Sequence, residues 1–234
     1  MPQSAKMRAR GQNYQNFLKM IEIPRLGVDI PARQLILDDH FFASLHPMTL
    51  ECLNWAGEFP YRPLVDVRAF HNDSHLFLEY QVREKCTRAL ETQNGCDVYK
   101  DSCVEFFVMP EGAEQYYNFE WNAIGTLCMS RRPGRRNATP APMEVLNSVL
   151  ASSTYGCRPF NEICGDNLWS LRVAIPCGAL FGDALKTWQG ARLKGNFYKC
   201  GDELSCPHYI TMFPIQTPSP DYHRPEFFRE IHCQ

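Results

Sequence analysis

The chain of 234 residues is 44% hydrophobic and 12% aromatic, which is enough apolar material to bury one large core. It carries 24 Lys and Arg against 26 Asp and Glu, a formal net charge of −2 at pH 7. This balance excludes an intrinsically disordered chain and a chain-wide positive field, so we expect a globular protein that binds neither nucleic acid nor membranes.

The first fifty residues differ from the rest of the sequence. Residues 1–20 are polar and lack an apolar period, and two Ile-Pro pairs follow at residues 23–24 and 30–31. Because proline fixes φ and lacks an amide donor, these pairs favour an extended chain. We therefore expect residues 1–50 to form an arm and an extended segment that pack on or flank a domain spanning residues 51–234.

The same region bears on location. Residues 1–20 lack the run of about 7–15 apolar residues that a secretory signal requires. No segment approaches the ~20 apolar residues of a membrane span. As it stands the sequence predicts a cytoplasmic protein, and an exported one if a leader has been removed from its start.

The chain has eleven cysteines, an odd number, and none of their spacings is Cys-x-x-Cys. Several lie in apolar runs, such as Cys103 and Cys128, where a free thiol behaves as a small buried hydrophobe. We expect most of them to be reduced rather than to form a disulfide framework, in agreement with a cytoplasmic location.

Alternation of apolar and polar residues predicts a series of short strands after residue 64. Val65, Val67 and Ala69 share one face of the first strand, and residues 76–84 form its hairpin partner across a turn at residues 71–74. Similar patterns predict further strands at residues 103–108, 116–122, 125–130, 168–175, 195–199 and 209–213.

Helical patterns are scarce in the sequence. One short helix fits residues 143–151, and another turn fits residues 176–181. Strands joined by turns, rather than by helices of about 10–15 residues, indicate an antiparallel sandwich and exclude a βαβ fold. The predicted fold class is therefore all-β, an antiparallel β-sandwich with one or two short helices.

The outward faces of the central strands carry carboxylates, an amide and a guanidinium, at Arg83, Glu105, Glu120 and Asn122. Any one of them taken alone is an ordinary solvated residue. Interleaved with aromatic residues such as Tyr99, they are what a sugar site needs. Sugar hydroxyls pair with planar polar groups, and the C–H face of a sugar ring packs on an aromatic ring.

Glu105 and Glu120 also allow an enzymatic interpretation, as the catalytic pair of a glycoside hydrolase. They lie on adjacent predicted strands, where their carboxyl groups could stand about 5–9 Å apart, the range used by retaining and inverting enzymes. The sequence contains no nucleotide-binding, zinc-protease or serine-hydrolase motif. Sugar binding without catalysis and glycoside hydrolysis therefore both stay open at this point.

Two further clusters allow more than one interpretation. Residues 195–202 fit a strand that ends in a turn, or a ligand-facing loop. A metal or redox site could be built on Cys200, Cys206 and His208, although their spacing matches no common zinc motif. Residues 131–136 place four arginines around a Pro-Gly turn, which fits a solvated hairpin tip or a contact to an acidic sugar or a phosphate.

Residues 99–107 (YKDSCVEFF) and 117–125 (YNFEWNAIG) resemble the central strands of family 9 carbohydrate-binding modules. Residues 169–176, 196–202 (NFYKCGD) and 218–228 resemble a branch of single-domain family 9-like proteins. The resemblance runs from about Leu53 to the C-terminus. It implies a β-sandwich that holds a terminal, reducing-end sugar between two aromatic rings and breaks no bond.

The resemblance implies roles for particular residues. Tyr99 and Tyr222 match the two clamp aromatics, which are Trp in the best-understood members, and Glu105 matches a polar contact between them. Glu120 stands where those members use an Arg. The implied ligand is a mono- or oligosaccharide. The remaining expected sugar contacts are Arg83, Asn122 and Asn196.

The resemblance bears on cofactors as well. Some family members hold structural calcium, but the acidic pair Asp38-Asp39 is too little to make a calcium loop in the first sixty residues. From the sequence we therefore expect no cofactor, and calcium stays an open alternative that the sequence does not require.

Overall fold

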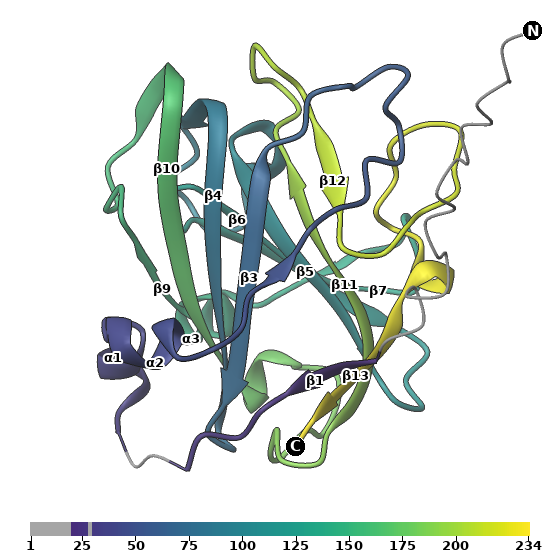
Figure 1. Ribbon diagram of the computed structural model, residues 1–234. Helices are drawn as coiled ribbons and strands as arrows, with labels where there is room; N and C mark the ends of the chain where they lie inside the picture. The colour runs from purple at the N-terminus through teal and green to yellow at the C-terminus, as the bar shows by residue number, and fades with distance from the viewer. Residues whose placement is uncertain (1–19, 28–29) are drawn as a thin grey trace, which may run out of the picture.

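The computed structural model describes residues 20–27 and 30–234 and consists of two β-sheets packed face to face (Figure 1). The larger sheet has the strand order β1-β13-β11-β5-β6-β7-β8, with β12 paired to β11, and the smaller sheet has the order β2-β3-β4-β10-β9. The pairing is antiparallel except between β1 and β13. The predicted all-β sandwich is therefore confirmed.

The larger sheet contains β1 (Ile21–Ile23), β5 (Cys103–Pro110), β6 (Tyr116–Asn122), β7 (Leu127–Arg132), β8 (Thr139–Pro140), β11 (Arg192–Cys200), β12 (Tyr209–Thr211) and β13 (Arg229–Cys233). The smaller sheet contains β2 (Met48–Thr49), β3 (Leu64–His71), β4 (His75–Ala89), β9 (Leu150–Ser153) and β10 (Phe160–Pro176). Three short helices accompany them: α1 (Ala32–Leu35), α2 (Asp39–Ala43) and α3 (Met143–Ser148). Single 3-10 turns occur at Val98–Lys100, Cys177–Ala179 and Pro225–Phe227.

Two predicted elements differ from the observed ones for identifiable reasons. The strand expected at residues 168–175 is only the second half of β10, because residues 160–167 are mostly exposed and carry no apolar alternation. The helix expected at residues 143–151 ends at Ser148, because Leu150 begins β9 and pairs with Ala174 of β10. Both differences show tertiary pairing overriding a local pattern.

The main core lies between the two sheets. Val104, Phe106 and Val108 of β5 point into it, and so do the alternate residues of β4 that the sequence pattern assigned to one face. Phe106 stacks on Phe197 of β11, with ring centroids 4.6 Å apart. The period-two pattern therefore identified the inward faces correctly.

The opposite face of the larger sheet is also covered, which corrects the expectation of a solvated outward face. Phe107, Tyr116 and Tyr198 on this face pack against Trp55 and Tyr222 from the loops, in a second buried cluster. Because the loops exclude water from the polar residues between these rings, Glu105 and Glu120 are buried instead of being exposed. The covered outer face therefore provides the setting for a binding site.

Residues within the first fifty take part in the sandwich. Ile21 and Ile23 of β1 enter the core, and β2 pairs with β3. Phe42 of α2 packs on Phe70 at the outer face of the smaller sheet. The sandwich therefore begins before residue 51. The sequence did not indicate β1, because a strand of three residues is too short to show an apolar period. Residues 1–19 of the expected arm lie outside the described part of the chain.

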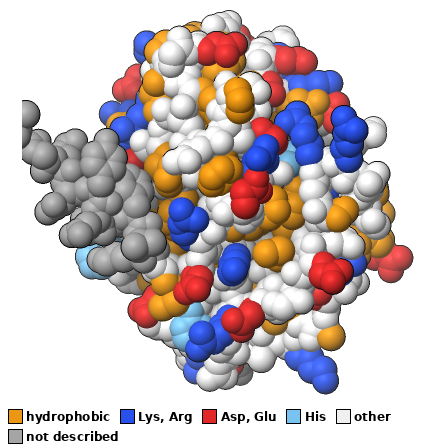
Figure 2. Space-filling model, turned by 90° about the vertical axis from the view of Figure 1, so that its right-hand side faces the viewer, with side chains coloured by type: hydrophobic (Ala, Val, Ile, Leu, Met, Phe, Trp, Pro, Cys, Tyr) orange, Lys and Arg blue, Asp and Glu red, His pale blue; other side chains and the backbone are white. Residues whose placement is uncertain are grey.

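The surface carries charges of both signs. Figure 2 views the side of the larger sheet and shows Lys and Arg mixed with Asp and Glu over this face. Asp38 and Asp39, the acidic pair considered for calcium, lie at the start of α2. Asp38 caps the helix by accepting a hydrogen bond from the amide of His40, and Asp39 pairs with Arg172 at 2.6 Å. In the described part of the chain, no helix has the length and apolarity needed to cross a membrane.

An ion pair joins the two sheets inside the protein. Lys199 Nζ on β11 lies 2.8 Å from Glu84 Oε2 on β4, and neither side chain is exposed. Trp169 Nε1 donates to Glu84 Oε1 at 2.8 Å, and Lys199 Nζ also lies 2.7 Å from His208 Nε2. Burial, followed by the charge of Lys199, lowers the pKa of His208 well below its usual value. His208 therefore accepts this hydrogen bond as a neutral imidazole.

Candidate functional site

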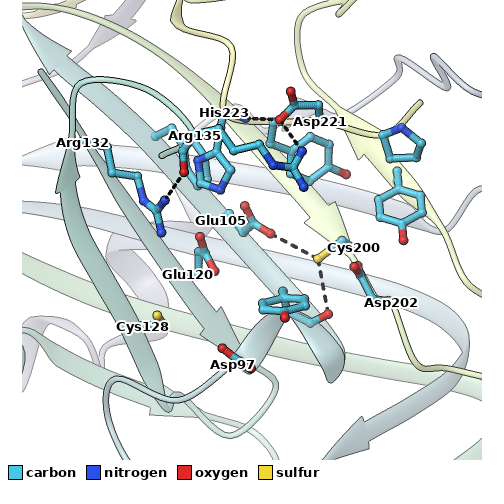
Figure 3. Close-up of a pocket in the computed structure, with 15 residues that line it drawn as sticks. Asp97, Glu105, Glu120, Cys128, Arg132, Arg135, Cys200, Asp202, Asp221 and His223 are labelled. Atoms are coloured by element: carbon cyan, nitrogen blue, oxygen red, sulfur yellow. Dashed lines mark hydrogen bonds and ion pairs between the residues drawn. The ribbon is translucent and has the colours of Figure 1, made fainter. Parts of the chain in front are cut away.

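A cavity of about 350 Å³ lies on the outer face of the larger sheet (Figure 3). Its walls come from strands β5, β6, β7, β11 and β12 and from loops at residues 97–99 and 220–223. Four of the seven expected sugar contacts line it: Tyr99, Glu105, Glu120 and Tyr222. The other lining residues are Asp97, Phe107, Cys128, Arg132, Arg135, Cys200, Asp202, Tyr209, Pro220, Asp221 and His223.

Strand register builds the floor of the cavity. Glu105 of β5 lies opposite Tyr198 of β11 on one side and opposite Glu120 of β6 on the other, and Glu120 lies opposite Cys128 of β7. Side chains at directly opposed positions of an antiparallel sheet point to the same face. Four neighbouring strands therefore present one row of side chains beneath the cavity.

The two carboxyl groups of this row are buried and close enough to influence each other. Burial, followed by the neighbouring Glu120, raises the pKa of Glu105 well above its usual value, and Cys200 Sγ donates a hydrogen bond to its Oε1 at 3.1 Å. Burial also raises the pKa of Glu120 to about 7. Asn118 Nδ2 donates to Glu120 Oε1 at 2.7 Å. Near neutral pH the floor can therefore both donate and accept hydrogen bonds.

Two tyrosines form the aromatic part of the cavity wall. Tyr222 is 8% exposed and stacks on Tyr198, with centroids 4.2 Å apart and planes at 9°. Its hydroxyl donates to the carbonyl of Lys199 at 3.0 Å, so its ring is held rigidly. The second ring, that of Tyr99, lies in the 3-10 turn at Val98–Lys100 and is 37% exposed. The cavity thus has one fixed and one more accessible ring.

Charged residues complete the wall. Arg132 Nε on β7 donates to Asn118 Oδ1 at 3.0 Å, which links it to Glu120. Arg135 Nη1, just past the end of the strand, lies 3.0 Å from Asp221 Oδ1. Figure 3 shows Arg132 and Arg135 on one side of the two glutamates and Asp202 on the other. Planar groups of both charge signs therefore face the cavity.

The stability of the protein is expected to depend on the protonation of His223. Burial, followed by the charges of Arg132 and Arg135, lowers the pKa of His223 from 6.5 to about 3. Since an unfolded histidine keeps a pKa of about 6.5, the unfolded state binds a proton below that pH that the folded state does not accept. The free energy of unfolding should therefore fall by about 1.4 kcal/mol per pH unit between pH 6.5 and 3 from this residue. Denaturant titrations at several pH values should give a shallower dependence for His223→Gln, and identical slopes would refute this assignment.

Arg83 does not reach the cavity. It lies on β4 in the smaller sheet, its side chain is 54% exposed, and its Nε is 3.6 Å from Asp166 Oδ1. The cavity is on the outer face of the other sheet. The prediction for Arg83 is therefore corrected. The alternation correctly indicated that its side chain points outward, but Arg83 belongs to the smaller sheet and the cavity lies on the larger one.

Asn122 and Asn196 are also absent from the cavity wall, because backbone groups use their amides. Asn122 donates to the carbonyl of Glu91 at 2.8 Å and accepts from the amide of Thr126 at 3.0 Å. Asn196 donates to the carbonyl of Phe213 at 3.1 Å and accepts from its amide at 3.0 Å. Both are fully buried, and both fix turns and strand ends instead of facing a ligand.

Several residues of the cavity wall belong to sequence clusters for which more than one interpretation was open. Arg132 and Arg135 belong to the arginine cluster at residues 131–136, and Asp202 ends the segment at residues 195–202. In both cases the ligand-facing alternative agrees with the position in the structure. Asp221 and His223 were indicated only by the family resemblance of residues 218–228, because a loop that returns to a distant sheet has no apolar period.

The alternative metal or redox site on Cys200, Cys206 and His208 is not assembled. His208 Nδ1 lies 2.9 Å from the carbonyl of Cys206, and its Nε2 faces Lys199. Cys200 Sγ instead faces Glu105. Among the described residues, the groups that bring three metal-ligating atoms together include neither Cys206 nor His208. This reading of the sequence is therefore wrong, because the strand end turns the side chains of Cys200 and His208 towards different partners.

Comparison with solved structures gives several similar proteins. A candidate carbohydrate-binding protein from Bacteroides uniformis is 34% identical, with a TM-score of 0.85, over 92% of this chain and 99% of that one. A family 9 carbohydrate-binding module from Caldicellulosiruptor kristjanssonii in complex with cellotriose is 12% identical, with a TM-score of 0.59, over 92% and 94% of the two chains. A structure described in the same words but with glucose is 13% identical, with a TM-score of 0.51, over 92% and 96%. The latter two show similarity of fold alone.

Comparison of the sequence gives the family. No curated protein matches the chain. The sequence profile of carbohydrate-binding family 9 matches residues 36–233, which includes every strand from β2 to β13 and the whole cavity wall. The chain therefore belongs to carbohydrate-binding family 9.

Proposed function

We propose that the cavity binds the terminal ring of a mono- or oligosaccharide and that no bond is broken there. The observation that carries this proposal is the joint presence of Tyr99, Tyr222 and a floor of carboxyl groups around one cavity. Its volume of about 350 Å³ falls within the usual range for small-ligand pockets, roughly 300–1,000 Å³. A pocket of this size suits the end of a sugar chain better than its middle.

The expected contacts follow from the chemistry of the wall. The apolar C–H face of a sugar ring packs on the tyrosine rings, and its hydroxyls pair with planar carboxyl and guanidinium groups. Tyr222, Glu105 and Glu120 are already held in place by neighbouring groups, so little conformational entropy is lost on binding. This preorganisation supports recognition of one ring in one orientation.

The arrangement of Glu105 and Glu120 favours binding over hydrolysis. In glycosidases the two carboxyl groups flank the scissile bond. Here both rise from adjacent positions of one sheet and lie on the same floor. They are therefore placed to contact the same side of a ligand.

A glycan-array screen followed by calorimetric titration tests the proposal. Saturable heat with at least one mono- or oligosaccharide is expected, together with the absence of new reducing ends after long incubation. Arg83→Ala serves as a matched control, because it removes an outward guanidinium far from the cavity and should leave the affinity unchanged. Turnover that Glu105→Gln abolishes would contradict binding without catalysis.

Arg132 is expected to contribute strongly to affinity. Its replacement by Ala removes a guanidinium from the wall and also leaves Asn118 Oδ1 without its donor. Loss of a charge-assisted hydrogen bond costs about 1.5–3 kcal/mol, so the dissociation constant should rise roughly 10- to 100-fold. The neighbouring Arg131 points to the other face, with its Nε 3.6 Å from Asp183 Oδ2, and Arg131→Ala is the control. Equal effects of the two substitutions in calorimetry would refute this role.

A further inference from the structure

Two thiols and a carboxyl group meet at the floor of the cavity. Cys103 on β5 lies directly opposite Cys200 on β11, and Glu105 lies two residues along β5 on the same face. The sulfur atoms of both cysteines and a carboxylate oxygen of Glu105 all lie within 4.8 Å of one another. All three residues are buried. Neither sugar stacking nor the packing of the sheet requires this combination.

We propose that Cys103, Cys200 and Glu105 form a site for a divalent transition-metal ion of the zinc type. Thiolates select borderline-soft ions such as Zn²⁺ and do not suit Ca²⁺ or Mg²⁺, which prefer oxygen ligands. A tetrahedral ion with Zn–S bonds of about 2.3 Å needs its sulfur ligands about 3.8 Å apart. The observed separations therefore permit coordination with side-chain shifts of about 1 Å or less.

The position of the three donors leaves one coordination position for a further oxygen. Cys200 and Glu105 line the cavity, whereas Cys103 is not part of its lining. Figure 3 shows Cys200 between Glu105 and Asp202. Either Asp202, water or a ligand oxygen in the cavity completes a tetrahedral set. Three protein ligands with an accessible fourth position are typical of zinc sites that bind a further molecule.

Proton release balances the charge of the incoming ion. In the metal-free protein the Cys200 thiol donates to Glu105. Binding transfers the thiol protons of Cys103 and Cys200, and any proton on Glu105, to solvent. The two thiolates then balance the charge of the divalent ion, and an ionised Glu105 leaves one net negative charge at the site.

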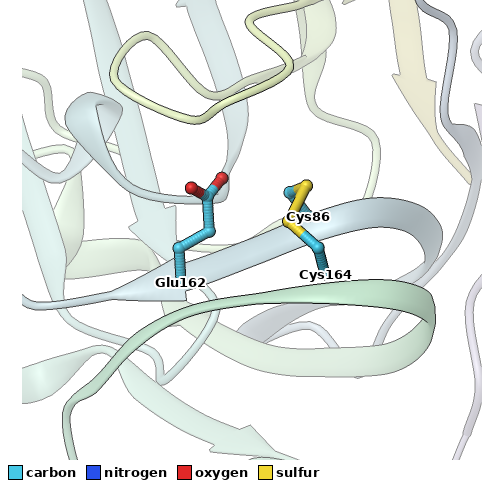
Figure 4. Close-up of side chains that lie close together, drawn as sticks. All are labelled: Cys86, Glu162 and Cys164. Carbon is cyan, nitrogen blue, oxygen red and sulfur yellow. A yellow bond between two sulfur atoms is a disulfide. The ribbon is translucent and has the colours of Figure 1, made fainter.

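A second group of the same composition does not qualify. Cys86, Glu162 and Cys164 also lie together (Figure 4), but the two sulfur atoms are joined in a disulfide between β4 and β10. The Glu162 carboxylate accepts hydrogen bonds from the amide and the hydroxyl of Ser205, at 2.7 and 2.5 Å. The remaining nine cysteines, including Cys103 and Cys200, are free thiols. Cysteine chemistry thus differs between the two groups.

Cobalt substitution under reducing, chelator-free conditions tests the proposal. The full chain titrated with Co²⁺ should bind one ion, displaceable by Zn²⁺, and should show the visible bands of tetrahedral Co²⁺ with sulfur-to-cobalt charge transfer. Charge-transfer intensity per bound ion should fall to about half in Cys103→Ser and in Cys200→Ser, because each keeps one thiolate. Glu105→Gln should keep the charge-transfer band but weaken Zn²⁺ binding at least tenfold.

Two thiols outside the cluster provide matched controls. Cys233→Ser replaces another fully buried thiol, and Cys157→Ser replaces an exposed one; both should bind Co²⁺ as the unaltered chain does. Thermal unfolding of each variant shows whether it is folded, and a cluster variant that fails to fold leaves the other two to decide. Absence of Co²⁺ and Zn²⁺ binding by the unaltered chain, or bands unchanged in the folded cluster variants, would overturn the site. Sugar titrations in the presence of a chelator separate this outcome from a failure of the proposed sugar binding.

Discussion

Replacing Glu84 with Gln is expected to lower the free energy of unfolding by about 3–5 kcal/mol. For a chain of this size the melting temperature should fall by roughly 6–20 °C. The substitution leaves the Lys199 ammonium buried between the sheets, facing a neutral amide and the neutral His208. Breaking a fully buried ion pair is costly because the surviving charge has no water to solvate it.

A double substitution distinguishes the pair from simple loss of packing. Glu84→Met combined with Lys199→Met removes both charges while keeping similar volumes, and it should be less destabilising than either single change. Asp166→Asn is the control, because it breaks the exposed pair with Arg83 and should cause no measurable change. Denaturant titration of Glu84→Met, Lys199→Met and the double variant, beside the unaltered chain, measures the coupling. A Glu84→Gln protein as stable as the parent would contradict the account of this pair.

Tyr99→Ala is expected to weaken sugar binding roughly 10- to 100-fold, or about 1.4–2.7 kcal/mol, with little change in melting temperature. Tyr99 is the more accessible of the two rings in the cavity wall, so its ring contributes more to the ligand than to the core. Tyr222→Ala should weaken sugar binding at least as much, but it should destabilise the protein as well. The ring of Tyr222 packs on Tyr198 and lies 6.1 Å from Trp55, centroid to centroid.

Tyr61→Ala is the control for this pair of substitutions. Tyr61 is a partly exposed aromatic residue that does not line the cavity, and its hydroxyl accepts a hydrogen bond from the amide of Lys85. Calorimetric titration should show parental affinity for this variant. Parental affinity in Tyr99→Ala as well would remove the cavity as the sugar site.

The sandwich could be predicted from the sequence because its signal is local. Strands such as β3, β5 and β6 bury alternate residues between the sheets, and that period appears within seven or eight residues. The contribution of Ile21 and Ile23 could not be predicted, because β1 gains its stability from pairing with β13, more than two hundred residues away. The first half of β10 could not be predicted for a similar reason, because it is defined by its pairing with β4.

The site was predicted in part. Glu105 and Glu120 were identified because they lie on strands with a readable alternation, which fixes the face they share. Arg83 was misplaced because alternation assigns a face of a strand but not the sheet that contains it. The sequence indicated Cys103 as a buried hydrophobe and grouped Cys200 with Cys206 and His208, because the contact of Cys103 with Cys200 depends on the register between β5 and β11. Positions on loops and contacts between strands far apart in sequence thus need the tertiary structure.

A crystal structure of the protein with the saccharide that binds best in the glycan-array screen tests the proposed site most directly. We expect the terminal ring to lie in the cavity, against Tyr99 and Tyr222, with its hydroxyls within hydrogen-bond distance of Glu105, Glu120 or Arg132. A saccharide bound elsewhere on the protein, with this cavity free of sugar, would contradict the proposal.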